Sequence, residues 1–152
     1  MTPQHPGTPP DPRNIRTIDL EIPSDVAEIE GVVNIVRREC EAMHFGRHQL
    51  MLNVPVALTE ALSNAILRGN ADDPRKRVQV RVQVDQAALI VEVKDEGPGF
   101  DIDECTIDPT TPERLECEDG RGLFLMRQLM DSVERFAAFP GNVVRLTLRR
   151  AS

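Results

Sequence analysis

Apolar and polar residues alternate along five short segments of this chain. Over 17–23, three aliphatic residues alternate with two acidic ones, which predicts a strand with one polar face. Over 77–84, four valines share one face and are followed, after a short turn, by the apolar run 89–93, so an antiparallel hairpin is expected. The segments 132–139 and 142–150, joined by a Pro-Gly turn, predict a second hairpin.

Two other segments have helical rather than strand spacing. Apolar residues recur every three or four positions over 26–43, with Ser24 as the expected N-cap and Gly46 as the expected stop. A second helix is expected from Gly120 onward, because the apolar sequence GLFLMRQLM follows a glycine-rich segment.

The central helix combines an apolar face with polar residues. Asn53 and Pro55 are start signals, and Gly69 followed by Asn70 is an end signal. Between them Leu58, Leu62 and Ile66 recur at the spacing of one buried face. A carboxylate and an amide nevertheless lie four residues apart on this helix, at positions 60 and 64.

Helices interspersed with one-sided strands predict a two-layer α/β sandwich. Its mixed, mainly antiparallel sheet should carry the helices on one face. The length of 152 residues suits one domain, expected over 15–152. Residues 1–14 hold five of the twelve prolines and predict a disordered tail.

Composition narrows the function classes. The net charge is −7 and the pI is near 5.0, which disfavours direct binding to nucleic acid or to an anionic membrane. No run of apolar residues approaches the roughly 20 of a membrane span. The first residues lack an apolar signal core, and the three cysteines form no CxxC pair. A cytoplasmic protein with reduced thiols is therefore expected.

Two glycine clusters are candidate ligand contacts. In DEGPGF, Asp95 ends a predicted strand, and Gly97 and Gly99 permit close approach of the backbone to a ligand. In DGRGLFLM, Gly120 and Gly122 precede a helix, whose free N–H groups can bind phosphate. Taken singly, either cluster can equally be an ordinary turn or loop end.

Glu60 and Asn64 form the third candidate. At an i, i+4 spacing both side chains lie on one side of the helix. An amide oxygen can ligate Mg²⁺ beside phosphates, and a carboxylate one turn away can accept a proton from an attacking hydroxyl. The alternative is a solvated pair at a helix edge.

The three motifs, in this order, resemble the N box and glycine boxes of the GHKL ATPases. Within that group, LTEALSNAI and the short chain resemble the serine kinases that act as anti-sigma factors in bacterial partner switching. The resemblance covers about residues 16–150 and implies the histidine-kinase-like ATPase fold.

The resemblance also implies roles for individual residues. Glu60 would be the general base, Asn64 the Mg²⁺ ligand, and Asp95 the acceptor for the adenine amino group. Gly97 and Gly99 would lie along the base and sugar, and residues 100–119 would form the nucleotide lid. The remaining implied contacts are those with the phosphates at the start of the last helix: Gly120, Arg121, Gly122 and Leu123.

Two positions depart from the family pattern. Arg68 stands where relatives often have histidine. Asn142 follows Gly141 where relatives often have threonine, so a hydroxyl near the adenine is expected to be missing.

The resemblance implies an ATP- and Mg²⁺-dependent serine/threonine-protein kinase that is also an anti-sigma factor. Its implied partners are a sigma factor and a STAS-domain anti-anti-sigma factor, and its implied state is a homodimer. Two alternatives stay open. One is a nucleotide-binding interaction module that binds a sigma factor or phosphatase without kinase activity. The other is a sensor histidine kinase fragment, although no upstream helix with a phospho-acceptor histidine is apparent.

Overall fold

A single antiparallel sheet forms one layer of the fold. The computed structural model describes residues 15–97, 118–137 and 141–151. Within them the strand order is β1-β2-β3-β5-β4, and all four pairings are antiparallel. The strands are β1 Arg16–Pro23, β2 Arg77–Val84, β3 Ala88–Asp95, β4 Ser132–Ala137 and β5 Asn142–Arg149. Both predicted hairpins are confirmed, and the sheet is antiparallel rather than mixed in the described part.

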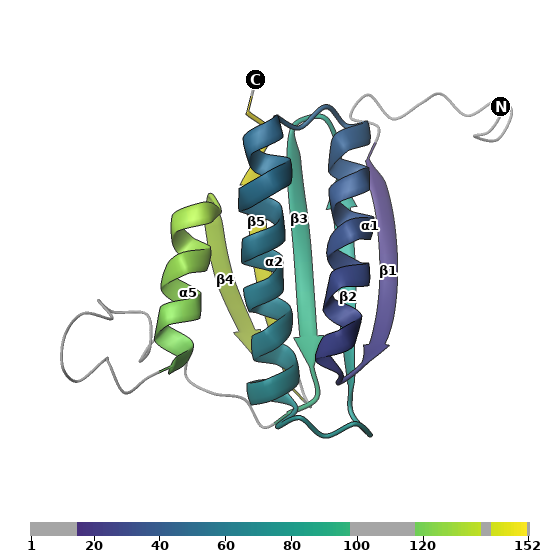
Figure 1. The fold of residues 1–152 in the computed structure, drawn as a ribbon, viewed down its shortest axis with the longest axis vertical. Coiled ribbons are helices and arrows are strands. Elements are labelled where there is room, and N and C mark those ends of the chain that lie inside the picture. The colour runs from purple at the N-terminus through teal and green to yellow at the C-terminus, as the bar shows by residue number, and fades with distance from the viewer. Residues whose placement is uncertain (1–14, 98–117, 138–140, 152) are drawn as a thin grey trace, which may run out of the picture.

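The helices form the second layer and cover one face of this sheet (Figure 1). They are η1 Val26–Glu28, α1 Ile29–Ala42, η2 Gln49–Asn53, α2 Val54–Ser63, η3 Asn64–Gly69 and α5 Glu118–Leu129. Helix α2 is central, with α1 on one side of it and α5 on the other. The predicted two-layer sandwich is therefore confirmed.

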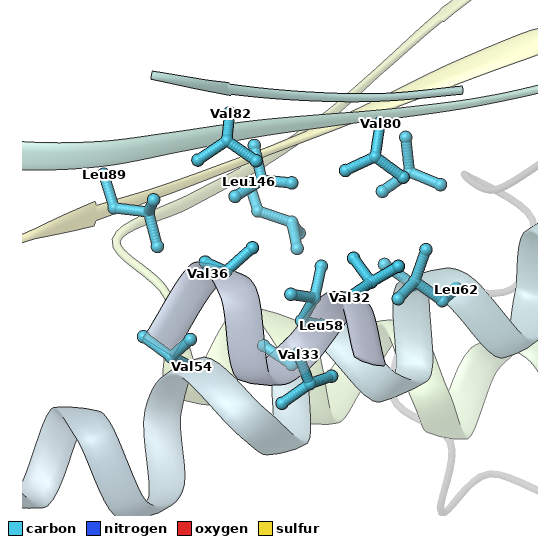
Figure 2. Packing of buried hydrophobic residues seen from close by; sticks show 14 of the residues in the cluster. Val32, Val33, Val36, Val54, Leu58, Leu62, Val80, Val82, Leu89 and Leu146 are labelled. Carbon is cyan, nitrogen blue, oxygen red and sulfur yellow. The ribbon is translucent and has the colours of Figure 1, made fainter. Parts of the chain in front are cut away.

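The core lies between the two layers (Figure 2). Valines of β2 meet the apolar faces of α1 and α2, where Val36 and Leu62 have no exposed surface. The opposite face of the sheet is polar, and ion pairs cross it, among them Arg145 with Glu92 at 2.8 Å. This division explains the alternation in the strands, because each strand has one face in the core and one in solvent.

Two helix boundaries differ from the prediction. Ser24 is not the cap: Asp25 accepts the Ala27 N–H at 2.9 Å, while the buried Ser24 hydroxyl donates to the Lys76 carbonyl at 2.8 Å. Helix α1 also ends before Gly46, because His44 adopts a left-handed conformation with φ 66°. The N–H groups of His44 and Phe45 donate hydrogen bonds to the carbonyls of Glu41 and Cys40 in the last turn of the helix. A glycine usually provides this kind of helix end.

The central helix is continuous from η2 through α2 to η3 and contains wider π turns at both ends. Before α2, the Val54 N–H bonds to the Gln49 carbonyl, and after it the Asn70 N–H bonds to the Ala65 carbonyl at 2.8 Å. The helix thus begins before the predicted Asn53, and it ends at Gly69 as predicted.

By length and composition, Gln49–Gly69 is the one helix among the described residues that could cross a membrane. Leu58, Leu62 and Ile66 on it are at most 2% exposed within the fold. That face is occupied by the core, so we interpret the apolar composition as that of a central packing helix. This helix also corrects the expectation that no apolar run reaches the length of a membrane span.

Candidate functional site

Asp95 is the last residue of β3 and its carboxyl is buried. The residue is 4% exposed, and its Oδ1 accepts the Gly97 N–H at 3.0 Å. Burial raises the pKa of Asp95, and the hydrogen bond from Gly97 acts in the opposite direction. A buried carboxylate is costly unless it has partners, so Asp95 is suited to accept hydrogen bonds from a ligand.

Three glycines lie against Asp95 from separate parts of the chain. A Cβ on Gly69 would come within 2.2 Å of Asp95 Oδ2, and one on Gly141 within 1.8 Å of the Asp95 carbonyl oxygen. A Cβ on Gly97 would come within 1.3 Å of the Gly69 carbonyl oxygen. Gly141 also has a φ of 104°, which side chains rarely adopt. The end of the central helix, the end of β3 and the start of β5 can meet here only because all three residues lack side chains.

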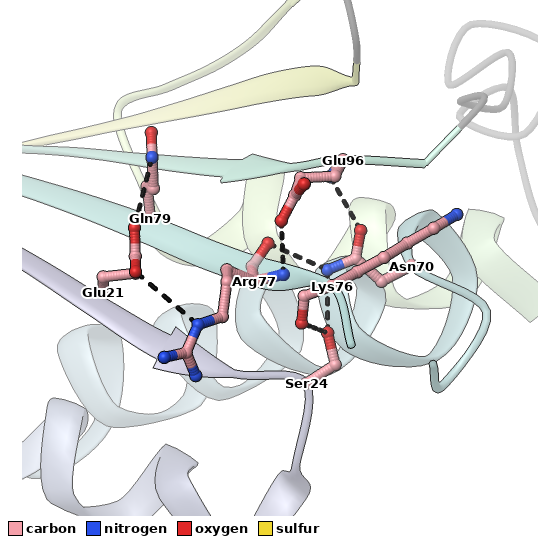
Figure 3. A network of polar contacts seen from close by, with 7 residues as sticks. All are labelled: Glu21, Ser24, Asn70, Lys76, Arg77, Gln79 and Glu96. Carbon is pink, nitrogen blue, oxygen red and sulfur yellow. Dashed lines mark hydrogen bonds and ion pairs between the residues drawn. The ribbon is translucent and has the colours of Figure 1, made fainter. Parts of the chain in front are cut away.

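A buried amide holds the segment after Asp95 in place (Figure 3). Asn70 has no exposed surface, and its Oδ1 accepts the Glu96 N–H at 2.7 Å. Its Nδ2 donates to Ser24 Oγ at 2.8 Å and to the Arg77 carbonyl at 3.0 Å. The Glu96 carboxylate in turn accepts the Arg77 N–H. This network connects the central helix to the ends of β1, β2 and β3.

A second amide lies on the other side of Asp95. Asn142 is opposite Asp95 in the β3–β5 ladder and is 3% exposed. Its Oδ1 accepts a hydrogen bond from the Arg135 guanidinium of β4. Asp95 is thus flanked by Asn70 through the backbone of Glu96 and by Asn142 through strand pairing.

Glu60 and Asn64 lie one helical turn apart, as predicted. The Asn64 N–H still bonds to the Glu60 carbonyl in α-helical register, and the second π segment of the helix begins at Asn64. Both residues are partly exposed, whereas Ala61, Leu62 and Ala65 between and beside them are buried. The pair therefore lies at the edge of the helix, where its apolar face ends.

The Asn64 amide fits the proposed role of a cation ligand. Its Nδ2 is buried and has no hydrogen-bond partner among the described residues. Because Nδ2 donates no hydrogen bond to a described residue, no such bond fixes the orientation of the amide. The amide oxygen can therefore point toward a hard cation, which prefers oxygen ligands. Among the described residues, no group of three or more His, Cys, Asp or Glu side chains could hold a metal. Phosphate oxygens and water would have to supply the other ligands.

The glycines of the last predicted cluster lie inside a helix rather than before it. Helix α5 begins at Glu118, so Gly120, Arg121 and Gly122 are its third, fourth and fifth residues rather than the residues before it. The Leu123 side chain is fully buried in the core, so a ligand could contact only its backbone. Gly99, residues 1–14 and the lid up to residue 117 lie outside the described residues.

Sequence reasoning did not predict that five further residues lie around Asp95 and the segment after it: Gly69, Asn70, Gly141, Asn142 and Arg135. Gly69 and Asn70 were interpreted as a helix end, and Asn142 only as a lost hydroxyl. One signal was available for Gly69, since a glycine at the end of an apolar helix is often there for close packing. The role of Arg135 has no sequence signal, because exposed arginines on strands are common.

Comparison with known proteins places this geometry in a family. The family model for the histidine kinase-like ATPase domain matches residues 22–148. The chain is 31% identical to the serine-protein kinase RsbW of Bacillus velezensis over 122 residues. The aligned region covers 77% of this chain and 76% of the relative. The chain is 30% identical to RsbW of Bacillus subtilis over 125 residues, and this alignment covers 79% of this chain and 78% of the relative.

An anti-sigma factor and a solved structure are also similar. The anti-sigma F factor of Bacillus cytotoxicus is 33% identical over 87 residues, which are 55% of this chain and 58% of the relative. The crystal structure of the RsbU and RsbW domains of Rv1364c from Mycobacterium tuberculosis matches with a TM-score of 0.64. It covers 90% of this chain and 33% of that one at 14% identity, so it supports the fold alone. The chain belongs to the histidine kinase-like ATPase family and, within it, to the anti-sigma-factor serine-protein kinases.

Proposed function

We propose that this protein is an anti-sigma factor and an ATP-dependent serine kinase whose substrate is a STAS-domain anti-anti-sigma partner. One observation carries the proposal: the helix that presents Glu60 and Asn64 ends with Gly69 packed against the buried Asp95 carboxyl. A single continuous helix thus connects candidate groups for both ends of ATP. The names of the relatives, serine-protein kinase and anti-sigma factor, support the same activity.

The proposed reaction is phosphoryl transfer to a serine hydroxyl. The serine oxygen attacks the γ-phosphorus, the bond from that phosphorus to the β,γ-bridging oxygen breaks, and ADP leaves. Glu60 takes the proton of the hydroxyl, and Asp95 accepts a hydrogen bond from the adenine amino group. Mg²⁺, when bound, would neutralise phosphate charge, with Asn64 as its ligand from the protein.

The proposed reaction would cause the kinase to exchange its STAS partner for the sigma factor. In the proposed cycle the unphosphorylated STAS protein occupies the kinase and the sigma factor is free. Phosphorylation adds nearly two negative charges to the partner, which weakens its contact with this already acidic chain of net charge −7. The kinase is then free to bind the sigma factor.

Glu60→Gln tests the proposed base, because glutamine is nearly isosteric but cannot take a proton at neutral pH. With γ-labelled ATP and the neighbouring-operon STAS protein, label transfer should fall by about 10²-fold or more, while ADP binding stays within about twofold. Glu41→Gln is the matched control, since it removes the same charge from an exposed position on α1 and should leave transfer unchanged.

Three results would count against the proposal. Transfer at the wild-type rate by Glu60→Gln would exclude Glu60 as the base. Wild-type chain that binds ADP but transfers no label would favour the nucleotide-binding interaction module. Asn64→Ala should weaken nucleotide binding more strongly with Mg²⁺ than without it, and an equal effect in both conditions would exclude Asn64 as the metal ligand.

A further inference from the structure

Asn53 of the central helix donates a hydrogen bond to the end of a different helix. Its Nδ2 lies 2.7 Å from the carbonyl oxygen of Leu129, the last residue of α5. Carbonyls in the last turn of a helix have no partner within that helix, so Asn53 satisfies this one from outside. The two helices lie side by side (Figure 1), and this bond joins them at one end.

This amide is unfavourable for the helix that contains it. Asn53 ends the π segment η2 within the continuous central helix and makes no cap hydrogen bond there. Asparagine is a poor residue for a helix interior. Its Oδ1 is buried and accepts no hydrogen bond from a described residue, which lowers stability further. An asparagine at this position therefore calls for an explanation outside the central helix, and its contact with α5 supplies one.

Apolar packing alone fixes the position of α5 only in part. Leu123 and Met126 have no exposed surface and hold the helix against the core. Such contacts are non-directional, so they determine the distance of α5 from the core better than its shift or tilt. A hydrogen bond is directional, so the bond from Asn53 determines where α5 ends.

The length of α5 transmits this position to its other end. The helix has 12 residues and is therefore about 18 Å long, so a rotation of about 5° at Leu129 would move its start by about 1.6 Å. In the proposed nucleotide complex the phosphates contact the start of α5, at Gly120 and Gly122, whereas the adenine lies at Asp95 on β3. Displacements of about 1 Å are large enough to weaken contacts at a reacting group.

We propose that Asn53 is a positioning residue, which fixes the end of α5 and thereby holds the start of this helix at the phosphates. The inference rests on the proposed nucleotide binding and extends it to a residue that does not contact the nucleotide. It requires that loss of the Asn53 bond weakens the contribution of the phosphates to binding and spares that of the adenosine.

Calorimetry with ADP and with adenosine, which lacks the phosphates, tests this requirement. Asn53→Ala should weaken ADP binding about fivefold, the scale of one hydrogen bond, and keep adenosine binding within twofold. Asn53→Asp has nearly the same shape but only acceptors at neutral pH, so two acceptors would meet at Leu129. It should weaken ADP binding at least as much. A purely structural role would change the binding of both ligands together or of neither.

Hydrogen exchange measured by NMR reports the position of α5 directly. Saturating ADP should protect the backbone N–H groups of residues 95–97 and 120–122 in the wild type. In Asn53→Ala the protection at 95–97 should remain, while that at 120–122 should fall at least about fivefold. This measurement decides the matter if adenosine binds too weakly for calorimetry.

Asn34→Ala is the matched control. Asn34 is also a half-buried amide within a helix, but its Oδ1 accepts a hydrogen bond from Arg37 of the same helix, α1, at 3.1 Å. Its loss should leave both affinities and the protection at 120–122 unchanged. A fivefold loss of ADP affinity in this variant would overturn the assignment, because any amide lost from the helical layer would then have the same effect.

The outcomes separate this inference from the proposed function. Equal weakening of ADP and adenosine binding in Asn53→Ala, or wild-type ADP affinity in Asn53→Asp, would overturn the inference alone. Failure of both variants to fold would do the same, because Asn53 would then be required by the fold itself. A wild-type chain that bound no ADP would instead overturn the proposed function, and this inference with it.

Discussion

The buried carboxyl of Asp95 lowers the stability of the fold at neutral pH. Burial raises the pKa of its carboxyl above the ordinary 3.8, so at neutral pH the charged form is held in a place that disfavours it. The folded chain then binds this proton more tightly than the unfolded chain does. The free energy of unfolding therefore falls as pH rises from about 3.8 through the folded pKa, and the loss is complete above it.

Asp95→Asn should therefore stabilise the protein at neutral pH. Asparagine keeps the shape and can still accept the Gly97 N–H, but it carries no charge to desolvate. Urea unfolding at pH 7 should show a higher free energy of unfolding than in the wild type, and the gain should shrink toward zero below about pH 4. An equal gain at all pH values, or a loss at pH 7, would contradict the assigned cause.

A candidate role for an individual residue could be predicted only where the residue belongs to a sequence motif. Asp95 was predicted from its place at a strand end before a glycine pair, and Asn64 from its spacing to Glu60, and the roles of both stay predictions. The place of Asn142 beside Asp95 was not predictable, because it depends on the pairing of β3 with β5 and on an arginine of another strand. Ser24 was wrong as a cap because Asp25, one residue later, bonds the helix start and leaves Ser24 to Asn70.

Among the secondary-structure elements, the central helix is the one that organises the site. The spacing of its apolar residues predicted the helix, and Gly69 predicted its end. Its π turns could not be predicted, because a register of five residues per hydrogen bond depends on the tertiary contacts at each end. The turns matter here because the last of them ends at Gly69, whose backbone lies against Asp95 and Gly97.

Gly69→Ala tests this contact between helix end and strand end. The added methyl would lie 2.2 Å from Asp95 Oδ2, so the helix or the carboxyl must move. We expect a loss of about 1–3 kcal/mol in the free energy of unfolding, as for other overpacked sites, and weaker ADP binding.

Gly31→Ala is its control, because nothing lies within 4 Å of a Cβ at that helical position. It should gain about 0.5–1 kcal/mol through helix propensity and leave ADP binding unchanged. A Gly69→Ala variant that was as stable as the wild type and bound ADP equally well would show that the helix end is not held against Asp95.

The whole molecule should be stabilised by its nucleotide. At an ADP concentration about 100 times Kd, binding to the folded chain alone adds roughly 2.7 kcal/mol to the free energy of unfolding. Thermal unfolding with Mg²⁺ and ADP should therefore occur at a higher temperature than with Mg²⁺ alone. The Tm of Asp95→Ala should not respond to ADP, and a wild-type Tm that did not respond either would contradict the proposed site.

At this scale the architecture was predictable from the sequence, because the two periods of hydrophobicity alone dictate one-sided strands and one layer of helices. The strand order was not, since pairing of β3 with β5 rather than with β4 joins segments separated by the long segment after Gly97. The glycine contacts around Asp95 depend on that order and could not be foreseen either.

The position of β5 between β3 and β4 has a consequence for biosynthesis. The proposed adenine side of the site combines residues 69–70, 95–97 and 141–142, so it requires the pairing of position 95 with position 142, which lie 47 residues apart. Contacts so distant along the chain form late, because closing the intervening loop costs entropy that only the finished sheet repays. A nascent chain should therefore acquire affinity for nucleotide only after β5 has left the ribosome, and no shorter fragment should be able to sequester ATP.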